Sequence, residues 1–178
     1  MRVPYTNFKT REGDNNALGS CTFKGGEWKE VDTTEIFDNK KVVVFALPGA
    51  FTPGCSSKHL PGYEEKYDEF KTLGIDEIYC LSVNDSFVMN AWARDLKIEK
   101  VKMLPDGEGV FTQGMGMLVN KPKQGFGMRS WRYSMLVDNG EVVKVFEEPG
   151  KNNFGDDKGT LEISSADTMV NYLKENNG

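Results

Sequence analysis

The chemistry suggested by this sequence is concentrated on one short turn that carries a cysteine and a threonine. Cys55 follows Thr52 by three positions, after a run of strand-forming residues and before a helical pattern. At a helix N-terminus, free backbone N–H groups and the positive end of the helix dipole stabilise an anion such as a thiolate. We therefore expect Cys55 to act as a nucleophile.

Ionisation by itself makes a thiol only modestly more reactive, because a more stable thiolate is also a weaker nucleophile. A fast thiol enzyme therefore needs fixed donors that stabilise its transition state. Thr52 offers a hydroxyl beside the sulfur. Arg132 lies on a predicted strand, where alternation places it on the face opposite Trp131 and Tyr133. We expect both side chains to serve the Cys55 site.

The elements that must position these residues alternate between buried strands and helices. Residues 42–47 and 78–83 are apolar and rich in β-branched side chains, which is typical of strands buried on both faces. Apolar residues recur at helical spacing from Leu60, and Gly74 supplies the left-handed position that ends such a helix. Pro61 is expected to kink this helix near its start.

Two hairpins are predicted. Residues 18–23 and 28–31 flank a Gly-Gly turn near the N-terminus, and residues 131–137 and 142–146 flank Asn139-Gly140. Asn-Gly is the strongest short signal for a type I′ hairpin turn. The second hairpin should therefore add antiparallel strands to the sheet.

Two further helices complete the pattern, and both begin at capping residues. Residues 84–86 start a helix with Val88, Ala91 and Trp92 on one face, and residues 164–167 start a helix whose buried stripe is Ala166, Met169, Val170 and Leu173. The fold class is therefore α/β, with a central mixed sheet covered by helices on both faces and an N-terminal β-hairpin. We expect a single domain over residues 1–178.

Composition excludes several classes of protein. The 178 residues carry a formal net charge of −5 without any dense basic run, so neither nucleic acid nor an anionic membrane is an expected partner. The longest apolar run is far shorter than the ~20 residues of a membrane-spanning helix. The N-terminus lacks a signal pattern, so a cytoplasmic location is expected.

Cys21, Cys55 and Cys80 are spaced neither as a disulfide framework nor as a zinc site.

The segment Pro48-Gly49-Ala50-Phe51-Thr52-Pro53-Gly54-Cys55 resembles the active-site signature of the peroxiredoxin family. It is most similar to the five-type subfamily, including the peroxiredoxin part of hybrid peroxiredoxin-glutaredoxin proteins. Residues 80–88, Ala91-Trp92 and Arg132-Tyr133-Ser134-Met135 follow in the order that this subfamily shows. The similarity covers most of residues 1–175.

The resemblance implies a thioredoxin-like fold and an antioxidant thiol peroxidase that reduces hydrogen peroxide and organic hydroperoxides. Cys55 would be oxidised to a sulfenic acid, Thr52 and Arg132 would orient and polarise the peroxide, and Pro48 would shield the sulfur. The resemblance also implies a homodimer whose active sites lie near the subunit boundary. Phe87 is either an interface residue or a core aromatic of its helix.

The sequence departs from some five-type members in its recycling chemistry, because no cysteine follows Cys80. Cys80 lies in a buried-strand pattern, and Cys21 lies on the expected N-terminal hairpin. The working hypothesis is a one-cysteine enzyme whose sulfenic acid reacts with an external thiol, glutathione with glutaredoxin, with thioredoxin as the other candidate reductant. No metal or organic cofactor is expected.

Three other functions compete with the peroxidase interpretation. A thioredoxin-type disulfide oxidoreductase is disfavoured because Ser57-Lys58 stands where a second cysteine would fall. A cysteine hydrolase would need His59, the single histidine, as its base. A histidine on the same helix as the cysteine does not place a base on the side of the sulfur where the substrate would bind. His59 is instead expected to be a packing or hydrogen-bonding residue. A redox sensor or holdase with the same fold remains open.

Overall fold

In the computed structural model, residues 1–13, 26–156 and 161–176 are described. The strands are β1 (Asn7–Glu12), β2 (Glu27–Asp32), β3 (Lys41–Ala46), β4 (Glu77–Ser82), β5 (Lys102–Pro105), β6 (Leu118–Lys121), β7 (Gly127–Ser130), β8 (Tyr133–Asp138) and β9 (Glu141–Glu147). The helices are α1 (Thr33–Phe37), a π-helical turn (Cys55–His59), α2 (Leu60–Thr72), α3 (Ser86–Asp95), α4 (Val110–Gly114) and α5 (Ala166–Asn176). No helix in these ranges is long and apolar enough to cross a membrane.

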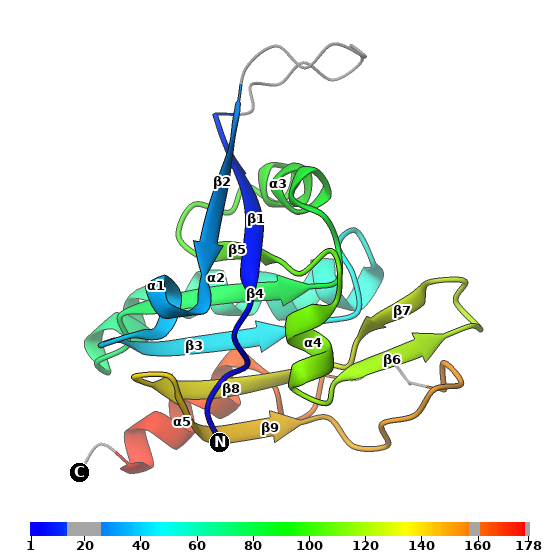
Figure 1. Cartoon of the computed structure of the whole chain (residues 1–178). Helices are drawn as coiled ribbons and strands as arrows, with labels where there is room; N and C mark the ends of the chain where they lie inside the picture. Colours follow the sequence, from blue (N-terminus) through cyan, green and yellow to red (C-terminus); the bar gives the residue numbers. More distant parts are fainter. Residues whose placement is uncertain (14–25, 157–160, 177–178) are drawn as a thin grey trace.

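A five-stranded mixed sheet in the order β5-β4-β3-β8-β9 forms the centre of the molecule (Figure 1). Its middle strand, β3, pairs in parallel with β4 and antiparallel with β8. After Lys41 every side chain of β3 is buried, as expected of an apolar, β-branched central strand. The predicted mixed sheet is confirmed.

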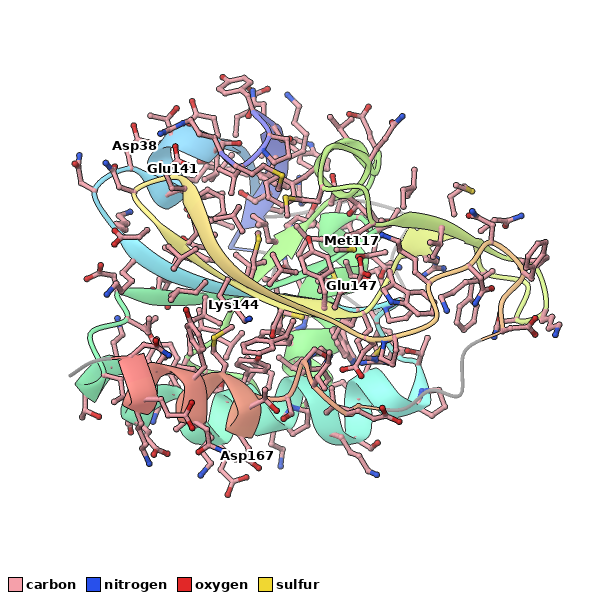
Figure 2. All side chains as sticks on the ribbon, turned by 90° about the horizontal axis from the view of Figure 1, so that it is seen from below. Asp38, Met117, Glu141, Lys144, Glu147 and Asp167 are labelled. Carbon is pink, nitrogen blue, oxygen red and sulfur yellow. The ribbon has the colours of Figure 1, made fainter. Side chains whose placement is uncertain are left out.

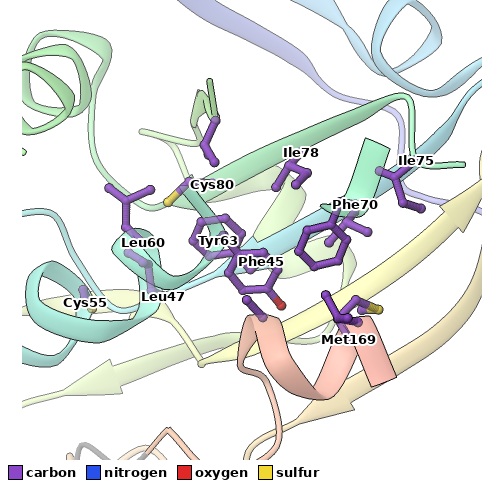
Figure 3. Close-up of a cluster of buried hydrophobic side chains, with 14 of the residues drawn as sticks. Phe45, Leu47, Cys55, Leu60, Tyr63, Phe70, Ile75, Ile78, Cys80 and Met169 are labelled. Atoms are coloured by element: carbon purple, nitrogen blue, oxygen red, sulfur yellow. The ribbon is translucent and has the colours of Figure 1, made fainter. Parts of the chain in front are cut away.

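Helices cover both faces of this sheet, as predicted. Figure 2 shows α2 and α5 together on one side of the β8-β9 hairpin, with α1 and α4 on the opposite side. Each face has its own apolar cluster. One cluster joins β3 to α2 and α5 through side chains such as Phe45, Tyr63 and Met169, and the other contains Phe37 and Phe111. Cys55 and Cys80 both belong to the first cluster (Figure 3).

The C-terminal elements follow the sequence pattern closely. Asn139 and Gly140 have φ angles of 49° and 79°, the two left-handed conformations that a type I′ turn requires between β8 and β9. Helix α5 buries Ala166, Met169, Val170 and Leu173, the predicted stripe. Gly74, with a φ of 90°, follows the end of α2 as predicted.

An N-terminal hairpin is present, and one of its strands is β1, which the sequence pattern did not predict. Strand β2 pairs antiparallel with β1, Asn7–Glu12, whereas residues 18–23 lie outside the described residues. The side chains of this ribbon are mostly polar on both faces, and Glu12 pairs with Lys29 across it at 3.1 Å. A ribbon with two polar faces has no apolar alternation to set its register, so the pattern did not reveal β1.

Helix α3 begins where predicted, and its inward face overlaps the predicted one in part. Asp85 caps it by accepting a hydrogen bond from the Val88 amide at 3.0 Å. The fully buried residues are Ser86, Met89 and Trp92, and Val88 is partly buried against the same core cluster, so the predicted face was correct for Val88 and Trp92. Spacing by three residues also gives a helical ridge, and apolar character alone did not distinguish it from the predicted one.

Candidate active site

The turn that carries Cys55 is fastened to the ends of β3 and β4. The Leu47 amide donates to the Leu81 carbonyl at 3.2 Å, which extends the β3–β4 ladder beyond Ala46. The Ser82 hydroxyl donates to Asn84 Oδ1 at 2.7 Å, and the same Oδ1 accepts from the Ala50 amide at 3.0 Å. These bonds hold the turn against the carboxyl edge of the parallel strand pair.

Cys55 lies in the first turn of the helical segment that follows. The first helical hydrogen bond runs from the Ser56 amide to the Thr52 carbonyl at 3.0 Å. Pro53, which has no N–H, occupies the start of the helix, where none is needed. The amide of Cys55 lies before this bond, among the N–H groups that have no intrahelical acceptor. The predicted location of Cys55 at a helix N-terminus is therefore confirmed.

The helical segment from Cys55 to His59 is a π-helical turn, which sequence reasoning did not anticipate. Such turns occur mostly as single turns and frequently at functional sites. Trp92, fully buried on α3, donates its indole N–H to the Ser56 hydroxyl at 2.9 Å. Helix α3 therefore supports the turn directly beside the cysteine.

Arg132 donates from Nη2 to the Cys55 Sγ across 3.3 Å. Both residues are buried, with 1% of Cys55 and 7% of Arg132 exposed. A fixed cation therefore lies against the sulfur where solvent screens it little. Alternation correctly predicted that Arg132 faces this site, although β8 itself begins one residue after Arg132, at Tyr133.

The sheet register explains how Arg132 reaches Cys55 from 77 positions away. Ala46 at the end of β3 pairs with Tyr133 at the start of the antiparallel strand β8. Arg132 therefore comes beside the turn that β3 enters. Trp131 and Tyr133 pack into the cluster on the other face of the sheet, so alternation directs Arg132 toward Cys55.

His59 holds the second arm of the Arg132 guanidinium. Arg132 Nη1 lies 2.9 Å from His59 Nδ1, and His59 Nε2 lies 3.1 Å from the Ser164 carbonyl oxygen. Because a guanidinium can only donate, Nδ1 must accept and the proton of a neutral imidazole must be on Nε2. Burial and, secondly, the Arg132 charge lower the pKa of His59 to about 3, so the ring stays neutral near pH 7. The predicted hydrogen-bonding role of His59 is confirmed.

Thr52 lies one turn before Cys55, and its hydroxyl donates to the Gly49 carbonyl at 2.7 Å. This bond uses the hydroxyl proton and leaves a lone pair that can accept a hydrogen bond from a substrate O–H. The preceding residue, Phe51, has a φ of 62° and is 54% exposed. A non-glycine residue in this conformation is uncommon and shows that the turn is tightly constrained.

Pro48 is buried, and its carbonyl accepts from Arg129 Nη1 at 3.2 Å. A Cβ atom at Gly49 would come within 2.6 Å of the same Arg129 nitrogen, so Gly49 is required for this close approach. Sequence reasoning missed Arg129. Its position on β7, an element far along the chain from the turn, gave no local signal.

Positive charge surrounds the sulfur. Burial lowers the pKa of Arg129 and of Lys121, and in each case a negative charge on Cys55 opposes that shift. Lys121 is almost fully buried, with its Nζ 5.1 Å from the centroid of the Trp131 ring. Lys121, Arg129 and Arg132 therefore all interact electrostatically with a negative charge at Cys55.

The other cysteines occupy different environments. Cys80 is fully buried on β4, and burial together with the Cys55 sulfur raises the pKa of its thiol well above the ordinary value. Cys21 lies outside the described residues. Across the described ranges, no three His, Cys, Asp or Glu side chains form a group that could hold a metal ion.

Phe87 packs within its own chain, against the N-terminal hairpin. Its ring meets Trp28 edge to face at a centroid distance of 5.5 Å, and the Arg11 guanidinium lies 4.7 Å from the centroids of both rings. Phe87 therefore joins α3 to the β1-β2 ribbon and is not part of either apolar cluster of the sheet.

Comparison with known proteins agrees with this geometry. Residues 13–168 match the Redoxin family. A peroxiredoxin from Synechocystis sp. is 54% identical over 175 residues, covering 97% of this chain and 89% of that protein. The hybrid peroxiredoxin hyPrx5 of Haemophilus influenzae is 54% identical over 172 residues, covering 97% of this chain and 64% of that protein.

A solved structure gives the same result. The Plasmodium falciparum antioxidant protein, a 1-Cys peroxiredoxin, matches with a TM-score of 0.89 and 37% identity over 99% of both chains. The fold is therefore thioredoxin-like, with the N-terminal antiparallel hairpin seen in Figure 1. With a reactive-site turn, a family match and close relatives in agreement, this chain belongs to the peroxiredoxin family of thiol peroxidases.

Proposed function

We propose that this peroxiredoxin reduces hydrogen peroxide and organic hydroperoxides with Cys55 as the peroxidatic cysteine. The observation that carries the proposal is the 3.3 Å hydrogen bond from Arg132 Nη2 to the Cys55 sulfur inside a buried site. The Thr52 hydroxyl accepts a hydrogen bond from the O–H of the peroxide, and Arg132 donates hydrogen bonds to the peroxide oxygens. Pro48 shields the sulfur from bulk water. The exposed ring of Phe51 at the same turn supports a role for apolar hydroperoxides.

In the proposed reaction, the Cys55 thiolate attacks the terminal peroxide oxygen along the O–O bond. A new S–O bond forms, the O–O bond breaks, and the electron pair leaves on the departing oxygen, which takes up a proton as water or an alcohol. Sulfur is oxidised to a sulfenic acid and the peroxide is reduced. Arg132 stabilises the negative charge that moves from sulfur to the leaving oxygen.

Recycling is proposed to follow a one-cysteine route. An external thiol condenses with the Cys55 sulfenic acid to give a mixed disulfide and water. A second thiol then attacks the external sulfur of that disulfide, so that Cys55 leaves as the reduced thiolate and the two donor thiols are oxidised to a disulfide. Among the described residues, the other cysteine is Cys80, whose burial and raised pKa disfavour attack. Similarity to a hybrid peroxiredoxin supports glutathione with glutaredoxin as the reductant.

The experiment is stopped-flow oxidation of the reduced protein by hydrogen peroxide, comparing wild type with Cys55→Ser, followed by addition of glutathione and glutaredoxin. We expect fast oxidation that depends on Cys55 and then many turnovers. Cys21→Ser is the matched test of the one-cysteine route, and it should turn over as wild type does. A single oxidation that stalls with abundant thiol would instead indicate a redox sensor.

A homodimer is also proposed, on the basis of the family resemblance alone. Light scattering coupled to gel filtration should give twice the chain mass of 20.0 kDa. A mass of one chain at micromolar concentration would contradict the proposal.

A further inference from the structure

The Ser164 carbonyl lies behind the active site and accepts hydrogen bonds from two buried side chains. His59 Nε2 lies 3.1 Å away, and the Tyr63 hydroxyl donates across 2.9 Å. All three residues are fully buried. The Ser164 carbonyl therefore helps to place the His59 ring and, like the Arg132 contact at Nδ1, requires its proton to be on Nε2.

Glu148 fixes the backbone that presents this carbonyl. Its side chain is buried and accepts from the Glu162 amide at 3.0 Å, the Ile163 amide at 3.0 Å, the Ser164 amide at 2.7 Å and the Ser164 hydroxyl at 2.6 Å. A carboxylate that accepts this many donors is a rigid anchor. Residues 162–164 are thus wrapped around one anion directly before α5.

Glu148 also contacts the strand that carries the arginine. Its own amide donates to the Arg132 carbonyl at 3.1 Å, continuing the β8-β9 ladder past Tyr133. One residue therefore holds the backbone of Arg132 and, by another route, the acceptor for His59. Glu148 therefore fixes the positions of both partners of the Arg132–His59 hydrogen bond.

A neutral imidazole separates the positive charge of Arg132 from the carboxylate of Glu148. A carboxylate in direct contact with Arg132 would orient the guanidinium but neutralise its charge. Here a neutral imidazole contacts the guanidinium, and the anion of Glu148 is satisfied by amides and a hydroxyl instead. Arg132 is held in place while its positive charge remains available to Cys55.

We propose that Glu148 is a positioning residue of the peroxidase: through the Ser164 carbonyl it fixes His59 as the Nε2–H tautomer, whose Nδ1 directs Arg132 onto the Cys55 sulfur. This inference rests on the proposed function. Glu148 does not touch the reacting atoms, so its effect must pass through the state of the His59 ring. That state can be measured independently of peroxide reduction.

The test uses Glu148→Gln, with Glu147→Gln as the matched control. Glu147 undergoes the same chemical change one residue away, where its carboxylate pairs with Lys151 at the surface. Because the chain contains one histidine, protein labelled with ¹⁵N-histidine reports on His59 alone. Nitrogen chemical shifts distinguish the two tautomers and the protonated ring.

In wild type and Glu147→Gln we expect a single Nε2–H tautomer that stays neutral from pH 8 to pH 5. In Glu148→Gln the second tautomer or exchange broadening should appear, and the rate constant with peroxide should fall about tenfold, by analogy with the lower range for losing a partner that orients a metal-bound histidine. Ser164→Ala removes one donor but keeps the carbonyl. It should cause a smaller change in the same direction, about two- to fivefold.

If Glu148→Gln lowers the rate while the His59 signals stay as in wild type, Glu148 has a general structural role and the proposal is wrong. A wild-type rate in Glu148→Gln would overturn it equally. Should Glu148→Gln fail to fold, the same comparison on Ser164→Ala decides. If wild type itself does not react rapidly with peroxide, the proposed function fails, whereas the link from Glu148 to the His59 tautomer is still decided by the spectra.

Discussion

Replacing Arg132 by lysine keeps the positive charge but removes the fork that contacts two partners at once. In wild type the guanidinium donates to Cys55 Sγ at 3.3 Å and to His59 Nδ1 at 2.9 Å. A lysine ammonium is a single point charge on a flexible stem and cannot reproduce this geometry. Arg132→Lys therefore separates the contribution of orientation from that of charge.

The distances give the expected size of the effect. At an effective dielectric constant of about 20, the attraction between the thiolate and the guanidinium charge at 3.3 Å is about 5 kcal/mol. If the lysine ammonium lies at about 5.5 Å from the sulfur, the same attraction is about 3 kcal/mol. The protonated thiol carries no charge, so this interaction is absent before ionisation and present in the thiolate and the transition state. It therefore lowers the barrier measured from the protonated thiol. The difference of about 2 kcal/mol corresponds to a loss of at most about 30-fold in rate.

Arg132→Gln removes the charge as well. Its loss should be larger, about 10²- to 10³-fold, as for removing one donor from an oxyanion hole. Arg94→Gln is the matched control, because it removes one positive charge from an exposed position on α3.

Stopped-flow fluorescence is the appropriate assay. Trp92 is buried and bonded to Ser56 beside the cysteine, so oxidation of Cys55 should alter its emission. The second-order rate constant with hydrogen peroxide is measured for each variant. If Arg132→Lys reacts at the wild-type rate, the fork geometry is unimportant, and a rate for Arg132→Gln within about threefold of wild type would refute the role of Arg132 altogether.

Three further predictions concern neighbouring groups. Thr52→Val should slow the reaction about 10- to 100-fold, because it removes the peroxide acceptor, whereas Thr52→Ser should stay within a few-fold of wild type in the same assay. His59 has a folded-state pKa of about 3 against 6.5 for the ordinary side chain, so below pH 6.5 the unfolded chain binds a proton that the folded chain does not. Its contribution to stability is therefore present above pH 6.5 and lost as the pH falls, by about 2 to 3 kcal/mol at pH 4.5. Urea unfolding at pH 7 and pH 4.5 should show this loss in wild type and a smaller one in His59→Gln, and equal losses would contradict the buried neutral ring. Cys80→Ala should lower the free energy of unfolding by about 1 kcal/mol and leave peroxide oxidation and thiol-dependent turnover within about twofold of wild type, since its thiol is buried and stays protonated. Loss of turnover in Cys80→Ala would point to a resolving role.

Local patterns in the sequence predicted most of the fold. The apolar run of β3, the Asn139-Gly140 turn and the buried stripe of α5 each depend on neighbours within a few residues, so their periodicity was sufficient. Strand β1 was not predicted because the two polar faces of the β1-β2 ribbon carry no such period.

The candidate site divides in the same way. The sequence by itself determined that Cys55 lies at a helix N-terminus after a buried strand, that Thr52 lies one turn before it, and that the chain resembles peroxiredoxins. Only the tertiary structure decided that Arg132 reaches the sulfur, because the pairing of Ala46 with Tyr133 across β3 and β8 sets that distance.

The tautomer of His59 and its support by Glu148 were also decided by tertiary structure alone. His59 and Ser164 are 105 positions apart, and Glu148 reaches Ser164 from the end of β9. A hydrogen bond of about 3 Å depends on the position and direction of both partners, and for residues far apart in the chain these are set by the packing of whole elements. Residue type and spacing therefore revealed which groups could react, and the packed sheet and helices determined which of them meet.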